Sequence, residues 1–316
     1  MRDGVEAESR SEVAVSGLSR REFVRLGTVG AAAAPFVLEA AATRAAAPTA
    51  QVVVDRIRRN VGVEWNPATV DAFKAGDPSS VVTGIATTSL ATIAVVRRAI
   101  QVGANLIITS GPTFYSRADT PTPAGRRGAP PPPADPVFEA KHDLLTQNRL
   151  VVWRFSDHWR ARTPDPFAQG IADALGWTKY RVNGDPLRIT VPTITIEALA
   201  KEVKTKLNAR GGMRVIGKPE ARVQKIAVLP GTISIQTTLT ILPDVDVLIA
   251  GEIREWESSE YARDLVHAGR NKGLILVGRS LSEEPGMNVC ATWLKTIVSE
   301  APVRWIPAGD PYWRPT

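Results

Sequence analysis

Four polar residues stand at positions where they could act as metal ligands. Asp157, His158, Glu252 and Glu283 each follow a short apolar run of the chain. Carboxylate and imidazole groups suit zinc, iron or manganese. A dinuclear hydrolytic centre needs about five or more such ligands, some of them bridging. These four residues therefore predict one divalent metal ion, or none.

The candidate histidine also has a second interpretation. The chain contains three histidines, and only His158 lies in a candidate loop, because His142 and His267 fall on predicted helices at positions that indicate exposure. A lone histidine is more often a structural residue that is hydrogen-bonded to the backbone. The residues alone leave both roles open for His158.

Other catalytic chemistry has little support in the sequence. There is no Gly-x-Ser-x-Gly motif and no glycine-rich phosphate loop. Cys290, the only cysteine, lies in a predicted amphipathic helix, where a buried and unreactive thiol is expected. A single cysteine also excludes a disulfide within the chain.

The elements that would position the candidate ligands are buried strands. Such strands are predicted at 81–87, 106–108, 151–155, 213–216, 223–229, 245–250 and 274–277. Helices are predicted at 90–103 with Ser89 as the N-cap, 138–148, 171–177, 195–207, 258–267 and 287–298, and residues 52–59 are expected to form a short helix or an extended lead-in. Strands and helices alternate, which predicts an α/β protein with a largely parallel or mixed sheet. Ligands in such folds bind at the loops beyond the carboxyl ends of the strands.

Two segments are predicted to lie outside regular structure. Residues 120–136 contain four consecutive prolines and indicate a surface loop. Residues 278–286 follow the last predicted strand and contain Pro285 and Gly286, so a loop is expected there too.

The N-terminus resembles an export signal. Arg20 and Arg21 precede a mildly apolar segment, Leu26–Leu38, and small residues with possible cleavage sites follow. This order predicts a twin-arginine signal peptide over residues 1–47, and hence a periplasmic or extracellular protein. An ordinary amphipathic helix is the alternative. No later segment is apolar enough to span a membrane, so no membrane contact is expected after signal removal.

The composition is that of a globular protein with a basic surface. Of the 316 residues, 44% are hydrophobic and 22% are charged, and the net charge is +7. Residues 1–47 hold six basic and six acidic side chains, so the rest of the chain keeps the full excess. The basic residues are scattered and form no stripe interleaved with aromatics, so nothing here indicates nucleic-acid binding.

Several stretches together resemble one known family. They are Asn60-Val61-Gly62-Val63, Gly103–Thr109, Leu199–Lys204, Val223–Val228, Gly251-Glu252 and Gly278–Glu283. In order and spacing they are similar to the NIF-three-like dinuclear metal-centre proteins, often labelled GTP cyclohydrolase I type 2 homologues. Pro112–Tyr115 and Asp157-His158-Trp159 look most similar to an exported branch of that family.

The departures from the family pattern all fall at its metal ligands. Ser110 and Gly111 stand where the resemblance implies histidine, or histidine and glutamate. Ser156, Arg160 and Arg279 likewise stand at positions where histidines are implied, whereas Glu283 keeps the family's glutamate. The sequence thus predicts the scaffold with a degenerate ligand set.

The resemblance implies a two-lobed α/β fold with mixed sheets flanked by helices. Residues 48–316 would form it, with one lobe from about 52–180 and 240–300 and a middle segment from about 185–238. It also implies a homo-oligomer, commonly a hexamer. Two functions remain open: a non-catalytic protein that binds a small anion in the former metal pocket, and a metal-dependent hydrolase with a reduced ligand set. The small molecule itself is not indicated.

Overall fold

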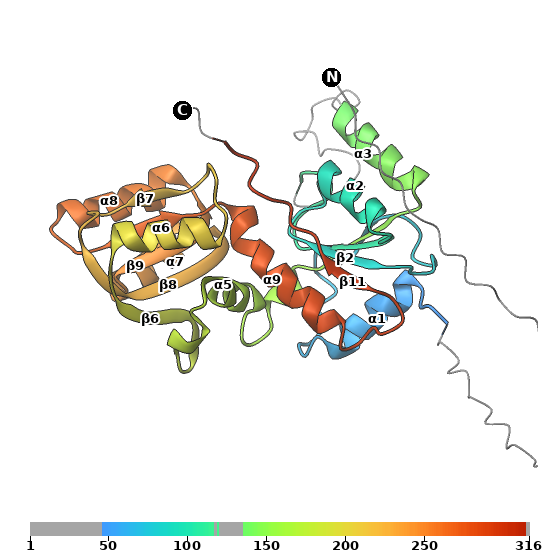
Figure 1. Ribbon diagram of the computed structural model, residues 1–316, viewed down its shortest axis with the longest axis horizontal. Coiled ribbons are helices and arrows are strands. Elements are labelled where there is room, and N and C mark those ends of the chain that lie inside the picture. The colour runs from blue at the N-terminus through green and yellow to red at the C-terminus, as the bar shows by residue number, and fades with distance from the viewer. Residues whose placement is uncertain (1–45, 117–118, 120–134, 314–316) are drawn as a thin grey trace, which may run out of the picture. The chain divides into compact units, whose positions relative to one another are not determined.

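The computed structural model describes residues 46–116, 119 and 135–313 (Figure 1). The predicted signal peptide lies outside these residues except for its last two positions. Most of the predicted proline-rich loop also lies outside them. The described chain contains two β-sheets with helices on their faces, so the predicted α/β class with mixed sheets is confirmed.

The first sheet has five strands in the order β1-β4-β3-β2-β11. Their bounds are β1 Phe73–Ala75, β2 Ile85–Thr88, β3 Leu106–Thr109, β4 Val151–Arg154 and β11 Val303–Trp305. Strands β2, β3, β4 and β11 are parallel to their neighbours, whereas β1 pairs antiparallel with β4. The predicted β-α-β unit is present as β2, α2 (Ile93–Gln101) and β3. Helix α2 starts later than expected, because Thr92 and not Ser89 is its N-cap.

The second sheet has six strands in the order β5-β6-β8-β9-β10-β7. Their bounds are β5 Arg181–Val182, β6 Asp185–Thr195, β7 Arg214–Ile216, β8 Arg222–Ile233, β9 Val247–Ile253 and β10 Gly273–Leu276. The central strands β8, β9 and β10 are parallel, and β6 and β7 pair antiparallel at the two sides. This sheet includes β9 and β10, which the expected lobe boundaries had grouped with the first lobe.

Helices cover both faces of each sheet. Their bounds are α1 Ala50–Asn60, α3 Pro136–Gln147, α4 Asp157–Arg160, α5 Pro166–Leu175, α6 Ile196–Lys206, α7 Ile235–Ile241, α8 Glu260–His267 and α9 Arg279–Leu294. Short 3-10 turns occur at Thr178–Tyr180 and Leu242–Asp244, and a π turn at Glu255–Ser259 precedes α8.

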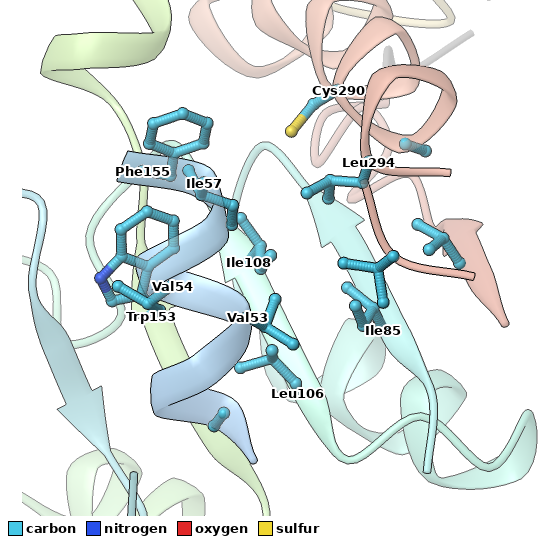
Figure 2. Close-up of a cluster of buried hydrophobic side chains, with 14 of the residues drawn as sticks. Val53, Val54, Ile57, Ile85, Leu106, Ile108, Trp153, Phe155, Cys290 and Leu294 are labelled. Atoms are coloured by element: carbon cyan, nitrogen blue, oxygen red, sulfur yellow. The ribbon is translucent and has the colours of Figure 1, made fainter. Parts of the chain in front are cut away.

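Apolar side chains of α1, the first sheet and α9 form one buried cluster (Figure 2). Val53, Val54 and Ile57 of α1 meet Leu106 and Ile108 of β3, and Leu294 of α9 joins the same cluster. The other face of this sheet packs against α2 and α3. In the second sheet, α5 and α6 cover one face and α7 and α8 the other.

Helix α9 corrects the prediction of a loop at 278–286. It starts at Arg279 and continues through Pro285, eight residues before the expected start. Its early residues make contacts that hold this segment helical: Ser282 Oγ accepts a hydrogen bond from Gly231 N, at 2.9 Å, and Leu281 and Met287 are buried. Packing thus outweighs the unfavourable helix propensity of Pro285 and Gly286. In the same helix, Met287 O accepts a hydrogen bond from Thr87 Oγ1 of β2, so α9 contacts both sheets.

Candidate functional site

Asp71, which the sequence did not single out, organises the loop after β4. Its carboxylate is buried and accepts hydrogen bonds from the backbone N–H groups of Ser156, Asp157 and His158 at 2.6–3.0 Å. These donors lie at the start of the short helix α4 (Asp157–Arg160), which has no side-chain cap from Ser156 itself. Asp71 therefore fixes the path of the chain at the predicted metal loop.

Both ring nitrogens of His158 are occupied by protein groups. Nδ1 lies 2.7 Å from Asp71 Oδ2, and Nε2 lies 2.9 Å from the backbone nitrogen of Asn66, which must be the donor. Nδ1 therefore carries the proton and Nε2 is the acceptor. The ring also stacks on Trp65, with centroids 3.6 Å apart and planes within 5°. His158 is 4% exposed and has no nitrogen left for a metal ion, so its geometry fits the structural role.

The carboxylate of Asp157 is also hydrogen-bonded within the protein. Its Oδ2 accepts hydrogen bonds from Thr69 Oγ1 at 2.9 Å and from Val70 N at 3.1 Å. Asp157 and His158 thus both bind the segment between α1 and β1. Ser156 contributes backbone groups: its N–H donates to Asp71, and its carbonyl oxygen accepts from Arg160 N at 2.9 Å.

Glu283 is held between two arginines. Its Oε1 lies 2.9 Å from Arg160 Nη2, and its Oε2 lies 3.7 Å from Arg279 Nε. The Glu283 side chain is 8% exposed, so these pairs are shielded from solvent on the carboxylate side. Arg160 is further fixed by Pro230 O and Asp165, and its guanidinium lies over the Phe167 ring. The structure therefore brings together Glu283, Arg160 and Arg279.

Glu252, near the end of β9, lines the same cavity as Arg279. It is exposed and accepts a hydrogen bond from Thr232 Oγ1 at 3.2 Å. Together with Arg279 and Arg214 it lines a cavity of about 640 Å³ beyond the carboxyl ends of β9 and β10. Asp310, in the segment after β11, contributes to the same cavity.

The loop after β3 contains Ser110 and Gly111, and it has no room for a side chain at Gly111. A side-chain carbon at Gly111 would lie 2.7 Å from Ser89 O and 2.4 Å from a Leu90 methyl carbon. Ser110 is buried, and its hydroxyl donates to Ser89 O at 3.3 Å. Ser89 in turn contacts Ser280 at the start of α9, with 2.8 Å between the hydroxyl oxygens. Ser110 therefore lies close to the α9 end of the site.

Arg154 is a second residue that sequence reasoning missed. It is the last residue of β4, is buried, and donates from Nε to Ser110 O at 3.3 Å. Burial lowers the pKa of Arg154, nearby Asp119 opposes this shift, and the positive charge of Arg279 adds to it. The sequence feature that could have indicated Arg154 is its position as a charged residue at the end of the apolar run Val151–Trp153.

Glu284 extends the buried polar network on the other side of Glu283. Its Oε1 lies 2.6 Å from Gly309 N, which donates to it. Burial raises the pKa of this carboxyl group, and its hydrogen bonds to Gly309 N and Ser280 Oγ partly offset the shift. Glu284 thus anchors the segment after β11.

The donor set does not fit a dinuclear metal centre. Within residues 46–116, 119 and 135–313, no group of three or more His, Cys, Asp or Glu side chains lies close enough together to hold a metal ion. Arg154, Arg160 and Arg279 occupy this region instead, and Glu283 is paired with two of them.

The comparisons with known proteins identify the class to which this architecture belongs. Residues 164–305 match the family model described as Duf34/NIF3 (NGG1p interacting factor 3). The fold is similar to that of the hypothetical protein SA1388 from Staphylococcus aureus, with a TM-score of 0.62 and 15% identity, covering 85% of this chain and 99% of that one.

Two further structures have the same fold. A Bacillus cereus protein related to NIF3 has a TM-score of 0.62 and 12% identity, covering 84% of this chain and 99% of that one. The protein ybgI, titled as of unknown function, has a TM-score of 0.61 and 18% identity, covering 84% of this chain and all of that one. No curated protein is similar enough in sequence to match.

The resemblance inferred from the sequence is thereby confirmed. Residues 164–305 carry the family's sequence signature, and the two sheets of the described chain have the fold of the solved structures. None of the helices in the described ranges is both long and apolar enough to cross a membrane.

Proposed function

We propose that this chain is an exported NIF3-like protein whose dinuclear metal site has been lost and whose pocket binds a small anion. One observation carries the proposal: Glu283, the acidic residue kept from the family pattern, is paired with Arg160 and Arg279. In the same region, both nitrogens of His158 are hydrogen-bonded within the protein.

Electrostatics disfavours a cation at this position. A divalent ion near Glu283 would be repelled by the guanidinium groups of Arg160 and Arg279, which stay charged at any physiological pH. Binding would also require breaking the ion pairs of Glu283. Without free imidazole nitrogens, the remaining oxygen ligands would give weak coordination.

Arg279 is suited to an anion instead. Its side chain is 40% exposed and lines the cavity of about 640 Å³ beyond β9 and β10. It starts α9, a helix of 16 residues, and backbone N–H groups at such a terminus add a favourable field for negative charge. Arg160 has its donors directed at Glu283, Asp165 and Pro230, so Arg279 is the residue expected to contact the ligand.

An anion titration tests this proposal. Calorimetry with inorganic phosphate should show saturable binding that Arg279→Gln weakens by about tenfold or more, because a charge-assisted contact is lost. Arg263→Gln on α8 is the matched control, since Arg263 pairs with Glu260, its neighbour on an exposed helix face. Equal phosphate affinity in wild type and Arg279→Gln would refute the assignment of the anion to Arg279.

Metal loading tests the loss of the metal site. After incubation with zinc, manganese or iron and removal of free metal, elemental analysis should find well under one equivalent per chain, whereas an intact site of this kind holds about two. The double variant Ser110→His plus Arg279→His restores two imidazoles and removes one positive charge, so it should retain more metal. Two equivalents in the wild type, or metal-stimulated hydrolase activity, would favour the alternative function.

Export and assembly remain predictions from the sequence. Replacing Arg20 and Arg21 by lysine should retain the precursor inside the cell, because the twin-arginine route requires the arginine pair. Cell fractionation measures this directly. Light scattering of the purified protein measures whether it forms the homo-oligomer that the resemblance implies.

A further inference from the structure

The groove between α5 and α9 contains a charged group that has no partner of opposite sign among the described residues. A cavity of about 730 Å³ lies along these helices, on a part of α9 that does not include Arg279. Arg162, in the connection between α4 and α5, lines this cavity together with Trp159 and Trp293. The volume falls within the range of small-molecule sites, which is about 300–1,000 Å³.

The guanidinium of Arg162 is held by aromatic rings and not by a carboxylate. Its Cζ lies 5.0 Å from the ring centroids of both Trp159 and Trp293, and these two rings are 5.2 Å apart. Nη1 of Arg162 is shielded from solvent and has no hydrogen-bond partner among the described residues. Burial lowers the pKa of Arg162, as expected for a positive charge without an adjacent carboxylate.

The acidic groups around the cavity are committed to other contacts. Glu284 accepts the N–H of Gly309, and Asp173 is bonded to the hydroxyl of Thr178. Lys206, the other cation of the lining, is paired with Glu202. Arg162 is therefore the cation of this cavity that has no ion-pair partner among the described residues.

We propose that this groove binds a small carboxylate ligand with an apolar body. The carboxylate would pair with the guanidinium of Arg162, which supplies donors in the planar geometry that carboxylates prefer. The apolar body would lie against Trp159, Trp293 and the exposed edge of Val289. This site is separate from the anion site proposed at Arg279.

The test compares two probes with the same apolar body. 4-Phenylbutyrate should bind the full chain at least about tenfold more tightly than 4-phenyl-1-butanol, because only the acid can pair with Arg162. Binding is measured by calorimetry and by quenching of tryptophan fluorescence. Arg162→Gln should lower the affinity for the acid to that for the alcohol, whereas Arg263→Gln on the exposed face of α8 should leave the difference unchanged.

A second variant keeps the test independent of any effect of Arg162 on folding. Asn288 is exposed on α9 and lines the groove, so Asn288→Trp should fill the groove without disturbing the core and should abolish binding of both probes. Equal affinities for the acid and the alcohol in wild type, no saturable binding of the acid, or unchanged binding in folded Arg162→Gln would each overturn the proposal. Phosphate binding at Arg279 is measured in a separate titration, so failure here is distinguishable from failure of the proposed function.

Discussion

The contact between His158 and Asp71 shows how closely a structural histidine can resemble a metal ligand. A metal-binding histidine commonly donates its second nitrogen to a carboxylate, which orients the ring. Here Asp71 takes that place, but the nitrogen that would face the metal accepts the N–H of Asn66. Both ring nitrogens of His158 are therefore hydrogen-bonded within the protein, and Trp65 stacks on one face of the ring.

Removing the charge of Asp71 should destabilise the protein. Asp71→Asn replaces a carboxylate oxygen with an amide N–H₂ facing donor groups, so one or more of its four hydrogen bonds is lost. We expect the free energy of unfolding to fall by about 2–4 kcal/mol, as for buried charge-assisted bonds. Urea denaturation at neutral pH measures the change.

Asp157→Asn is the matched control for this prediction. Asp157 follows in the same loop, but its carboxylate accepts from Thr69 and Val70 near the surface. Its substitution should cost about 1 kcal/mol or less. Equal losses for the two variants would show that Asp71 does not organise the loop.

The sequence identified the loops of the site but not the bonds within it. The unusual residues Ser110, Gly111, Arg160 and Arg279 were visible by their type and place. The partners of His158 could not be predicted, because every residue type except proline has a backbone N–H like that of Asn66. Likewise, only the folded chain shows that Arg160 and Arg279 both reach Glu283.

At the level of elements, α9 depends on its close approach to α5. A side-chain carbon at Gly170 of α5 would lie 2.3 Å from the backbone of Pro285, and one at Gly286 would lie 2.4 Å from the Phe167 ring. The two helices therefore meet backbone to backbone at this point. Such an approach is possible only where neither helix carries a side chain.

Gly170→Ala should separate the two helices and lower stability. Because the obstructing atoms belong to the backbone of Pro285 and Gly286, they cannot rotate away, and overpacking of this kind costs about 1–3 kcal/mol. Thermal or urea unfolding measures the loss. Gly212→Ala is the control, since its new methyl group would meet only movable side chains, the nearest atom being on Tyr312 at 3.3 Å. A neutral effect of Gly170→Ala would contradict the tight contact.

The sequence predicted the strands that are buried along their whole length, but it did not predict the segments whose secondary structure depends on packing against other elements. The apolar runs in β3, β4 and β10 are buried along their whole length, and their composition indicated this. Strand β6 contains Pro186 and Pro192 and alternates weakly, so no strand was expected there. The first half of α9 has loop composition and becomes helical through its contacts with α5 and β8.

At the scale of the whole molecule, an ion pair joins two distant parts of the sequence. Arg56 of α1 forms a bidentate contact with Glu300, which follows α9, with N–O distances of 2.9 and 2.7 Å. Arg56 also donates to Ile297 O at 3.3 Å. The hydrogen-bonded guanidinium is the main cause that lowers the pKa of Glu300, to about 2.

The contribution of this pair should depend on pH. Because the carboxyl group of Glu300 titrates at a lower pH in the folded protein than the ordinary value of 4.5, its stabilisation is fully present above 4.5 and is lost as the pH falls towards 2. Arg56→Gln should therefore lower the free energy of unfolding by about 1 kcal/mol at neutral pH and by progressively less in acid. Urea denaturation of both proteins across this range measures the difference. A difference that does not change with pH would contradict the assignment.

Helix α9 contributes its first turn to the candidate anion site and packs against strands of both sheets. Unfolding of either sheet alone would remove part of the packing that stabilises α9. The two sheets should therefore unfold together, and calorimetry should record a single cooperative heat-absorption peak. A compound bound at Arg279 would then shift the midpoint of that one peak, so thermal screening would detect ligands of the site without knowledge of any reaction.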